Sequence, residues 1–152
     1  MSAGSETYIA YDSNSIQLGD SAGQLMYRPG GFATLDAMEV GNGGMSAAEQ
    51  QAIFSLYGLI KTPLYIGADV TTLEGATLEV YKNKDIIGWN QDPLGVPGRQ
   101  IRKAGDPKGE LWGGPLAGGA GAAVLLNRGA KAMNISVTWE ELRMAGAPHY
   151  GA

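Results

Sequence analysis

The apolar positions in the first half of the chain favour a helix between two short strands. Ser46 and Glu49 have the spacing of a capping box, in which a hydroxyl and a carboxylate each satisfy a free backbone N–H at a helix start. Apolar residues then recur at i, i+3, i+4 and i+7 on one helical face, namely Ile53, Leu56, Tyr57 and Ile60. Pro63 cannot continue a helix and favours extended geometry for Thr62, so we expect the helix to end near Lys61.

Strand patterns flank this helix. Residues 64–70 form a short apolar run that is predicted to be a buried strand, and residues 37–41 are a weaker strand candidate. A strand, a helix and a strand over this distance predict a βαβ unit with a parallel sheet. Two more helices are expected, one over residues 73–81 and a short one that Asn83 caps and Pro93 ends.

The pattern changes after residue 98. Residues 110–112, 122–126 and 133–139 are short runs separated by glycine or polar turns, which is typical of an antiparallel meander. We therefore place the boundary between an α/β part and a β part at residues 92–98.

Composition limits the fold and the function classes. A chain of 152 residues cannot contain a complete (β/α)₈ barrel, which needs about 250 residues. The net charge of −4 argues against a nucleic-acid partner, and the longest apolar stretch is shorter than the ~20 residues of a membrane span. With no cysteine and a single histidine, the sequence predicts neither a disulfide framework nor a metal site, and it predicts no cofactor.

Six short motifs stand in order along the chain. They are Gly30-Gly31-Phe32, Met38-Glu39-Val40-Gly41-Asn42-Gly43-Gly44-Met45, Thr62-Pro63-Leu64-Tyr65-Ile66-Gly67-Ala68-Asp69-Val70, Asn90-Gln91-Asp92-Pro93-Leu94-Gly95, Leu111-Trp112-Gly113-Gly114-Pro115-Leu116-Ala117-Gly118-Gly119 and Val124-Leu125-Leu126-Asn127-Arg128. In that order and at those spacings the series closely resembles the α-galactosidases (melibiases) of glycoside hydrolase family 27. The resemblance is strong from residue 30 to residue 139.

The resemblance implies a fold in two parts: a partial (β/α)₈ barrel followed by a partial antiparallel β-sandwich. Residues 1–29 would be an N-terminal arm related to earlier barrel strands, and residues 30–97 the last βα units. Residues 98–142 would begin the β domain, and residues 143–152 would be a tail. The chain is thus expected to be a truncated member of the family. Relatives are usually secreted, vacuolar or lysosomal, whereas this chain starts without a signal-peptide pattern, so its location stays open.

The resemblance also implies a pair of catalytic carboxylates. A retaining glycosidase uses a nucleophile and an acid/base about 5–5.5 Å apart. Residues 8–13 resemble the family's nucleophile motif and assign Asp12 to that role, while residues 14–20 resemble the acid/base motif and assign Asp20. Both cannot keep family positions without a large deletion between them, so the alternative is that both are polar turn residues.

Other residues have candidate roles under the same resemblance. Asp36 stands where the family places an aspartate that binds sugar hydroxyls, and the alternative is a structural role at the end of a strand. Asp69 is expected to cap a turn, and Asp92 to serve the architecture. The three tryptophans favour core packing over sugar stacking.

The implied function is that of an α-galactosidase-like glycoside hydrolase, which removes terminal α-D-galactosyl residues by a retaining mechanism. Because most of the catalytic core is absent, the isolated chain is expected to be inactive. The alternative is a non-catalytic fragment, or a carbohydrate-binding or interaction module that needs a partner to fold. The expected partners are α-galactoside sugars, with self-association through exposed strand edges, and neither nucleic acid nor membrane.

Overall fold

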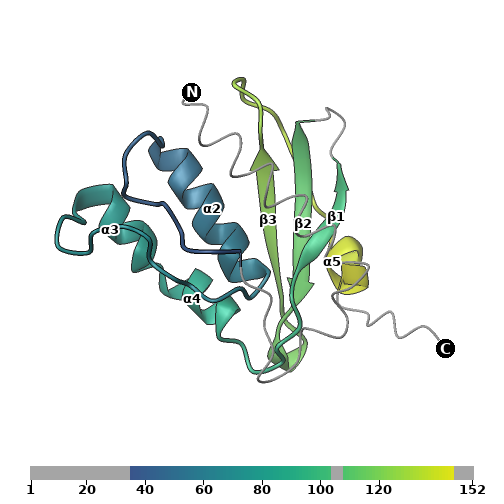
Figure 1. The fold of residues 1–152 in the computed structure, drawn as a ribbon. Coiled ribbons are helices and arrows are strands. Elements are labelled where there is room, and N and C mark those ends of the chain that lie inside the picture. Colours follow the sequence, from purple (N-terminus) through teal and green to yellow (C-terminus); the bar gives the residue numbers. More distant parts are fainter. Residues whose placement is uncertain (1–34, 104–107, 146–152) are drawn as a thin grey trace.

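The computed structural model describes residues 35–103 and 108–145. Three helices form a layer against one face of a three-stranded antiparallel sheet, and a short fourth helix lies on the opposite face (Figure 1). The elements, in chain order, are α2 (Ala47–Leu59), α3 (Gly75–Tyr81), α4 (Lys84–Asn90), β1 (Arg99–Lys103), β2 (Gly109–Pro115), the single 3₁₀ turn η2 (Ala117–Gly119), β3 (Gly121–Asn127) and α5 (Trp139–Ala145).

The predicted central helix is confirmed as α2, with the capping box at its start. The Ser46 hydroxyl accepts a hydrogen bond from the Glu49 N–H at 3.3 Å, and the Glu49 carboxylate accepts one from the Ser46 N–H at 2.7 Å. Both bonds satisfy N–H groups that a helix start leaves unpaired. Near its other end, Lys61 adopts a left-handed backbone conformation with φ of 57°, which ends the helical path just before Pro63.

The strands expected on either side of α2 are only partly present. Residues 37–41 and 64–70 share a single parallel bridge between Met38 and Ile66, so the predicted parallel direction holds but no extended strand forms. The prediction that residues 64–70 are buried is wrong, because Tyr65, Ile66 and Val70 are 59%, 44% and 62% exposed. A parallel strand becomes buried when neighbours cover both its faces and its edges, and the described residues supply one such neighbour.

The two short helices are confirmed as α3 and α4. The Asn83 side chain caps α4 by accepting hydrogen bonds from the N–H groups of Asp85 and Ile86, at 3.1 and 3.2 Å. None of the described helices has the length and hydrophobicity needed to cross a membrane.

The sheet corrects one strand assignment. The antiparallel pairing of β2 with β3 is confirmed, but the third strand is β1, which pairs with β2 across a bulge between Gln100 and Arg102. Residues 133–138 do not form the predicted strand, and α5 begins directly after them. The stronger local signal was a second capping box: the Glu141 N–H donates to the Thr138 hydroxyl at 3.2 Å, and the Thr138 N–H donates to the Glu141 carboxylate at 2.8 Å.

The core lies between the helical layer and the sheet. The buried face of α2 contributes Ile53, Phe54, Leu56 and Tyr57, and the sheet contributes Trp112, Val124 and Leu126 to the same cluster. A partly buried ion pair lies on the sheet, where Glu110 accepts hydrogen bonds from Arg128 at 2.7 Å and from the Trp112 indole at 2.7 Å. The buried indole N–H and the buried Glu110 carboxylate therefore both have hydrogen-bond partners.

Candidate functional site

The candidate sugar-binding residue Asp36 lies where the described chain begins, next to a fixed backbone position. The Leu35 N–H donates to the Thr62 hydroxyl at 3.0 Å, and the Leu35 carbonyl accepts from the Tyr57 hydroxyl at 3.1 Å. Both bonds are buried. Because Tyr57 lies on α2 and Thr62 follows that helix, the two bonds fix the backbone of Leu35 and therefore the position of the next residue, Asp36.

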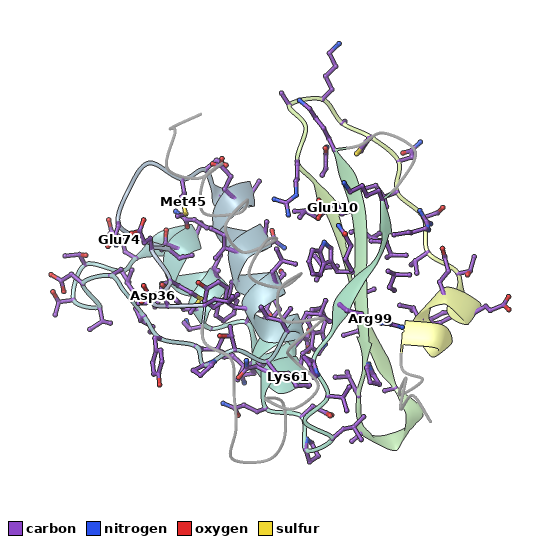
Figure 2. The ribbon with its side chains drawn as sticks, turned by 45° about the vertical axis from the view of Figure 1, so that its right-hand side comes forward. Asp36, Met45, Lys61, Glu74, Arg99 and Glu110 are labelled. Atoms are coloured by element: carbon purple, nitrogen blue, oxygen red, sulfur yellow. The ribbon has the colours of Figure 1, made fainter. Side chains whose placement is uncertain are left out.

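Asp36 itself is exposed and has an unusual backbone conformation. Its φ is 77°, a region that residues other than glycine rarely adopt but that aspartate tolerates better than most. One carboxylate oxygen accepts a hydrogen bond from the Ala37 N–H at 2.7 Å. Figure 2 shows Asp36 on the helical layer, well away from Glu110 of the sheet. Within the described residues, Asp36 lies two residues before the bridged residue Met38.

Asp69 makes the turn that follows the bridged segment. Its carboxylate accepts hydrogen bonds from the Thr71 hydroxyl at 2.6 Å and from the Thr71 N–H at 2.9 Å. These two bonds, the hydroxyl first, lower the pKa of the Asp69 carboxyl below its ordinary value. The turn-capping role predicted for Asp69 is confirmed. In the parallel bridge Asp69 follows Ile66 and Asp36 precedes Met38, so the two carboxylates lie toward opposite ends of the bridged pair.

Asp12 and Asp20, the residues assigned to the catalytic pair, lie outside the described residues. Within residues 35–103 and 108–145 there is no group of three or more histidine or carboxylate side chains that could hold a metal ion. The described part therefore supplies one exposed candidate sugar contact, Asp36.

Asp92 joins the helical layer to the sheet, in agreement with the architectural role expected for it. Its two carboxylate oxygens accept hydrogen bonds from the Ala117 N–H at 3.1 and 3.0 Å, and one of them also accepts from the Leu94 N–H at 3.0 Å. The Lys61 ammonium lies 4.0 Å from the same carboxylate. Figure 2 shows Lys61 low in the view, where the helices and the sheet meet.

Lys61 is a buried charge that the sequence analysis did not single out. Its side chain is 4% exposed, and its ammonium donates a hydrogen bond to the Trp89 carbonyl. Burial lowers the pKa of Lys61, while the charge of Asp92 opposes that change. Lys61 stands just before Thr62-Pro63, at a predicted helix end, and a lysine at a helix end usually faces water. The local sequence therefore did not indicate that its side chain is buried.

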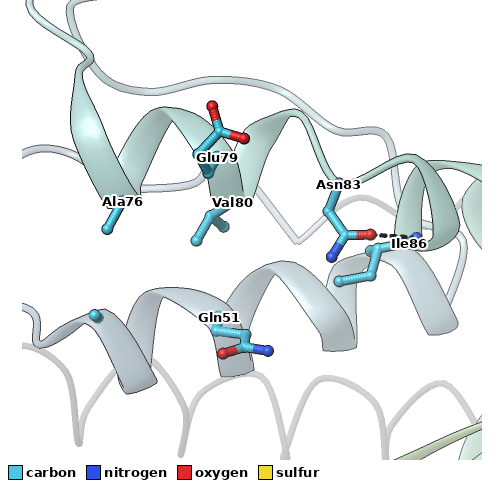
Figure 3. Close-up of a pocket in the computed structure, with 7 residues that line it drawn as sticks. Gln51, Ala76, Glu79, Val80, Asn83 and Ile86 are labelled. Atoms are coloured by element: carbon cyan, nitrogen blue, oxygen red, sulfur yellow. Dashed lines mark hydrogen bonds between the residues drawn. The ribbon is translucent and has the colours of Figure 1, made fainter.

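A shallow groove of about 270 Å³ lies between α2 and the pair α3 and α4 (Figure 3). Its lining holds one charged side chain, Glu79, which forms an ion pair with Lys82 at 2.8 Å. The groove is mostly apolar and does not contain Asp36, so it is not the candidate sugar site. Its lining residues are Ala47, Gln51, Ala76, Glu79, Val80, Asn83 and Ile86.

The tryptophans differ from one another. Trp112 is 1% exposed and belongs to the core, and Trp89 packs against that core, as expected for both. Trp139 does not, because its side chain is 82% exposed at the start of α5. The prediction of core packing fails for Trp139 because the segment before it does not join the sheet.

Comparisons with known proteins show which family this chain is similar to. A family profile described as alpha galactosidase A matches residues 9–92, a region that includes Asp12, Asp20 and Asp36. Alpha-galactosidase 2 of Arabidopsis thaliana is 43% identical over 115 residues, which are 76% of this chain and 28% of that protein. The alpha-galactosidase of Coffea arabica is 42% identical over 107 residues, which are 70% of this chain and 28% of that protein.

Solved structures agree with the sequence comparisons. Alpha-galactosidase I from Mortierella vinacea superposes with a TM-score of 0.73 at 36% identity, over 78% of this chain and 29% of that chain. The alpha-galactosidase of Saccharomyces cerevisiae, solved with raffinose, superposes with a TM-score of 0.69 at 31% identity. The fold is that of part of a glycoside hydrolase. The chain belongs to the alpha galactosidase A (melibiase) family, and it spans about 28% of the length of the curated relatives it matches.

Proposed function

We propose that this chain is the segment of an α-galactosidase-type glycoside hydrolase that holds the last βα units, residues 30–97, and the first strands of the antiparallel domain, residues 98–142. One observation carries the proposal: the chain superposes on an alpha-galactosidase over 78% of its own length and 29% of that enzyme's. The parallel bridge between Met38 and Ile66, on either side of α2, supports the assignment of a βα unit to residues 37–70.

The proposal includes the absence of turnover by this chain alone. Retaining glycosidases need two carboxylates held in one preorganised site, and a displacement of the order of 1 Å already lowers the rate steeply. In this proposal the barrel elements among the described residues are the bridged pair and α2 to α4. Because the chain spans about 28% of the length of its relatives, we expect it not to complete a site around Asp12 and Asp20.

Turnover is tested with purified chain and a chromogenic α-galactoside. The control is the double variant Asp12→Ala, Asp20→Ala, which removes both candidate carboxylates and keeps every described contact. We expect the two proteins to give the same background rate. Hydrolysis by the wild type clearly above that of the double variant would refute the proposal.

Asp36 is the proposed sugar contact. Its exposed carboxylate would accept hydrogen bonds from galactose hydroxyls, each worth about 1.5–3 kcal/mol when one partner is charged. Asp36→Asn keeps the shape and removes the charge, so galactose binding should weaken roughly ten- to hundred-fold.

Asp69→Asn is the matched control, since Asp69 is also an exposed carboxylate that accepts a backbone N–H at a turn. It should leave galactose binding unchanged. Isothermal titration calorimetry or ligand-observed NMR with galactose measures both variants. Equal binding by the wild type and Asp36→Asn would assign Asp36 a structural role only.

A further inference from the structure

The loop that leads into α2 contains the dipeptide Asn42-Gly43. Every other asparagine of the chain is followed by a residue that carries a side chain. Asn42, Gly43 and Gly44 are all exposed, and Gly43 has a φ of 85°, a conformation that glycine adopts without strain. Figure 2 shows Met45, the residue that follows this loop, on the side of the helical layer away from the sheet. The dipeptide is therefore open to water.

The backbone nitrogen of Gly43 is unobstructed. Within the described residues its N–H makes no hydrogen bond. A Cβ atom on Gly43 would meet no described heavy atom within 4 Å, apart from those of its chain neighbours. Glycine itself has no side chain that would hinder the approach of its nitrogen to the residue before it. This nitrogen is therefore free to react with the side-chain amide of Asn42.

The reaction that this arrangement favours is deamidation through a cyclic imide. The Gly43 nitrogen gives up its proton to the solvent and forms a bond with Cγ of Asn42. The bond between Cγ and Nδ2 breaks, and Nδ2 takes a proton from water and leaves as ammonia. A water molecule then opens the ring at either of its two carbonyl carbons, so residue 42 becomes aspartate or isoaspartate. Water is the single co-reactant.

The amide group of Asn42 makes a contact that this reaction removes. Its Nδ2 donates a hydrogen bond to the Gly67 carbonyl at 3.1 Å, while the Gly67 N–H donates to the Met38 carbonyl at 2.9 Å. Both backbone polar groups of Gly67 are thus held. A carboxylate at position 42 accepts hydrogen bonds but donates none, so it would repel the Gly67 carbonyl.

We propose that Asn42 is a site of spontaneous deamidation, and that the modification releases Gly67 from the loop that leads into α2. The product carries one more negative charge in a chain whose net charge is −4. The reaction needs water alone, so it is independent of any glycosidase activity.

The test follows the purified full chain during incubation in neutral and in mildly alkaline buffer. Peptide mapping by mass spectrometry measures the deamidated fraction at each asparagine, and electron-transfer fragmentation distinguishes isoaspartate from aspartate. Asn134 is the matched control within the chain, because it is also exposed and outside the helices and strands, but the branched Ile135 follows it.

We expect Asn42 to deamidate about ten-fold or more faster than Asn134, because the Cβ and branched side chain of Ile135 hinder ring closure. The rate at Asn42 should rise with pH, since the attacking nitrogen must lose its proton, and isoaspartate should be among the products. Equal rates at Asn42 and Asn134, or a product without isoaspartate, would overturn the proposed site.

The structural consequence is tested with Asn42→Asp, which supplies one product in uniform form. Hydrogen exchange of the Gly67 amide should be about ten-fold faster in this variant than in the wild type, because its segment has lost a bond to the loop. Asn134→Asp adds the same charge to the segment before α5 and should leave that exchange unchanged. The same exchange at Gly67 in both variants would overturn the release of Gly67. The time course on the wild type does not depend on how either variant folds.

Discussion

At the scale of single residues, Lys61 combines an unusual backbone conformation with a buried charge. Its backbone φ of 57° lies in the left-handed region, and its ammonium is buried between the Trp89 carbonyl and the Asp92 carboxylate. A buried ammonium loses hydration, and the two partners recover only part of that loss. The backbone of Lys61 therefore ends the helical path, and its ammonium pairs with the Asp92 carboxylate. The cost of burying its charge opposes folding.

The charge of Lys61 predicts a pH dependence. In the folded chain the pKa of Lys61 lies below the ordinary value of 10.5, so the folded state releases this proton before the unfolded state does. The destabilisation is fully present below the folded pKa and is relieved as pH rises toward 10.5. The unfolding free energy of the wild type should therefore rise with pH relative to that of Lys61→Met, which keeps the length of the side chain without the charge.

Urea unfolding followed by tryptophan fluorescence measures both proteins at about pH 7 and at about pH 10, and the difference between their unfolding free energies is compared. Subtracting the variant removes the titration of other groups, such as Tyr81, whose pKa burial raises. A difference that is constant or falls with pH would contradict the prediction.

At the scale of elements, α5 depends on one carboxylate. Glu141 caps the helix through Thr138 and forms an ion pair with Arg102 of β1, which holds α5 against the sheet. The hydrogen bond from Arg102, with a smaller contribution from the Thr138 N–H, lowers the pKa of Glu141 to about 2. The short run at residues 133–139 suggested a strand, whereas the two capping hydrogen bonds favour a helix start.

The attachment of α5 should weaken in acid. The folded pKa of Glu141 lies below the ordinary 4.5, so its contribution is complete above 4.5 and is lost as pH falls through about 2. Arg102→Gln removes the first cause of the shift and should raise the Glu141 pKa toward 4.5. NMR titration of the Glu141 carboxyl checks this, with Lys103→Gln, an exposed lysine on the same strand, as the control. The same midpoint in Arg102→Gln and in wild type would contradict the role of Arg102.

At the scale of the whole molecule, the helical layer and the sheet meet through two glycines. The Gly98 N–H donates to the carbonyl of Leu59 at the end of α2, at 2.8 Å, so the connection between the two layers is anchored there. A Cβ atom on Gly114 of β2 would lie 2.6 Å from the Cα of Gly98. The backbones of Gly98 and Gly114 are therefore so close that a side chain on Gly114 would clash with Gly98.

Gly114→Ala should therefore destabilise the whole fold. The clash is with backbone, which cannot move without separating β2 from the segment before β1, and overpacking of this kind typically costs about 1–3 kcal/mol. Gly88→Ala in α4 is the control: a Cβ there meets open space, and alanine favours a helix over glycine by up to about 1 kcal/mol. Thermal unfolding should thus show opposite shifts in Tm for the two variants. If Gly114→Ala were as stable as the wild type, the backbones of Gly98 and Gly114 would have to be farther apart than in this structure, which would contradict the prediction.

The sequence by itself determined the elements whose signals are local. The capping box at Ser46, the apolar stripe of α2, the Asn83 cap of α4 and the turn at Asp69 were all readable, because each depends on hydrogen bonds and side-chain spacing within four residues. The motif series also indicated the family. The role of Asp36 stays a prediction, and those of Asp12 and Asp20 concern residues outside the described part.

Tertiary structure decided what depends on distant neighbours. It made β1 the third strand in place of residues 133–139, buried the charge of Lys61 and left the apolar residues 64–70 exposed. An apolar run is compatible with a buried strand or with an exposed edge, and the outcome depends on whether neighbouring strands are present to cover it. Local pattern predicted the segments, and the one bridged neighbour that the described residues supply leaves Tyr65, Ile66 and Val70 exposed.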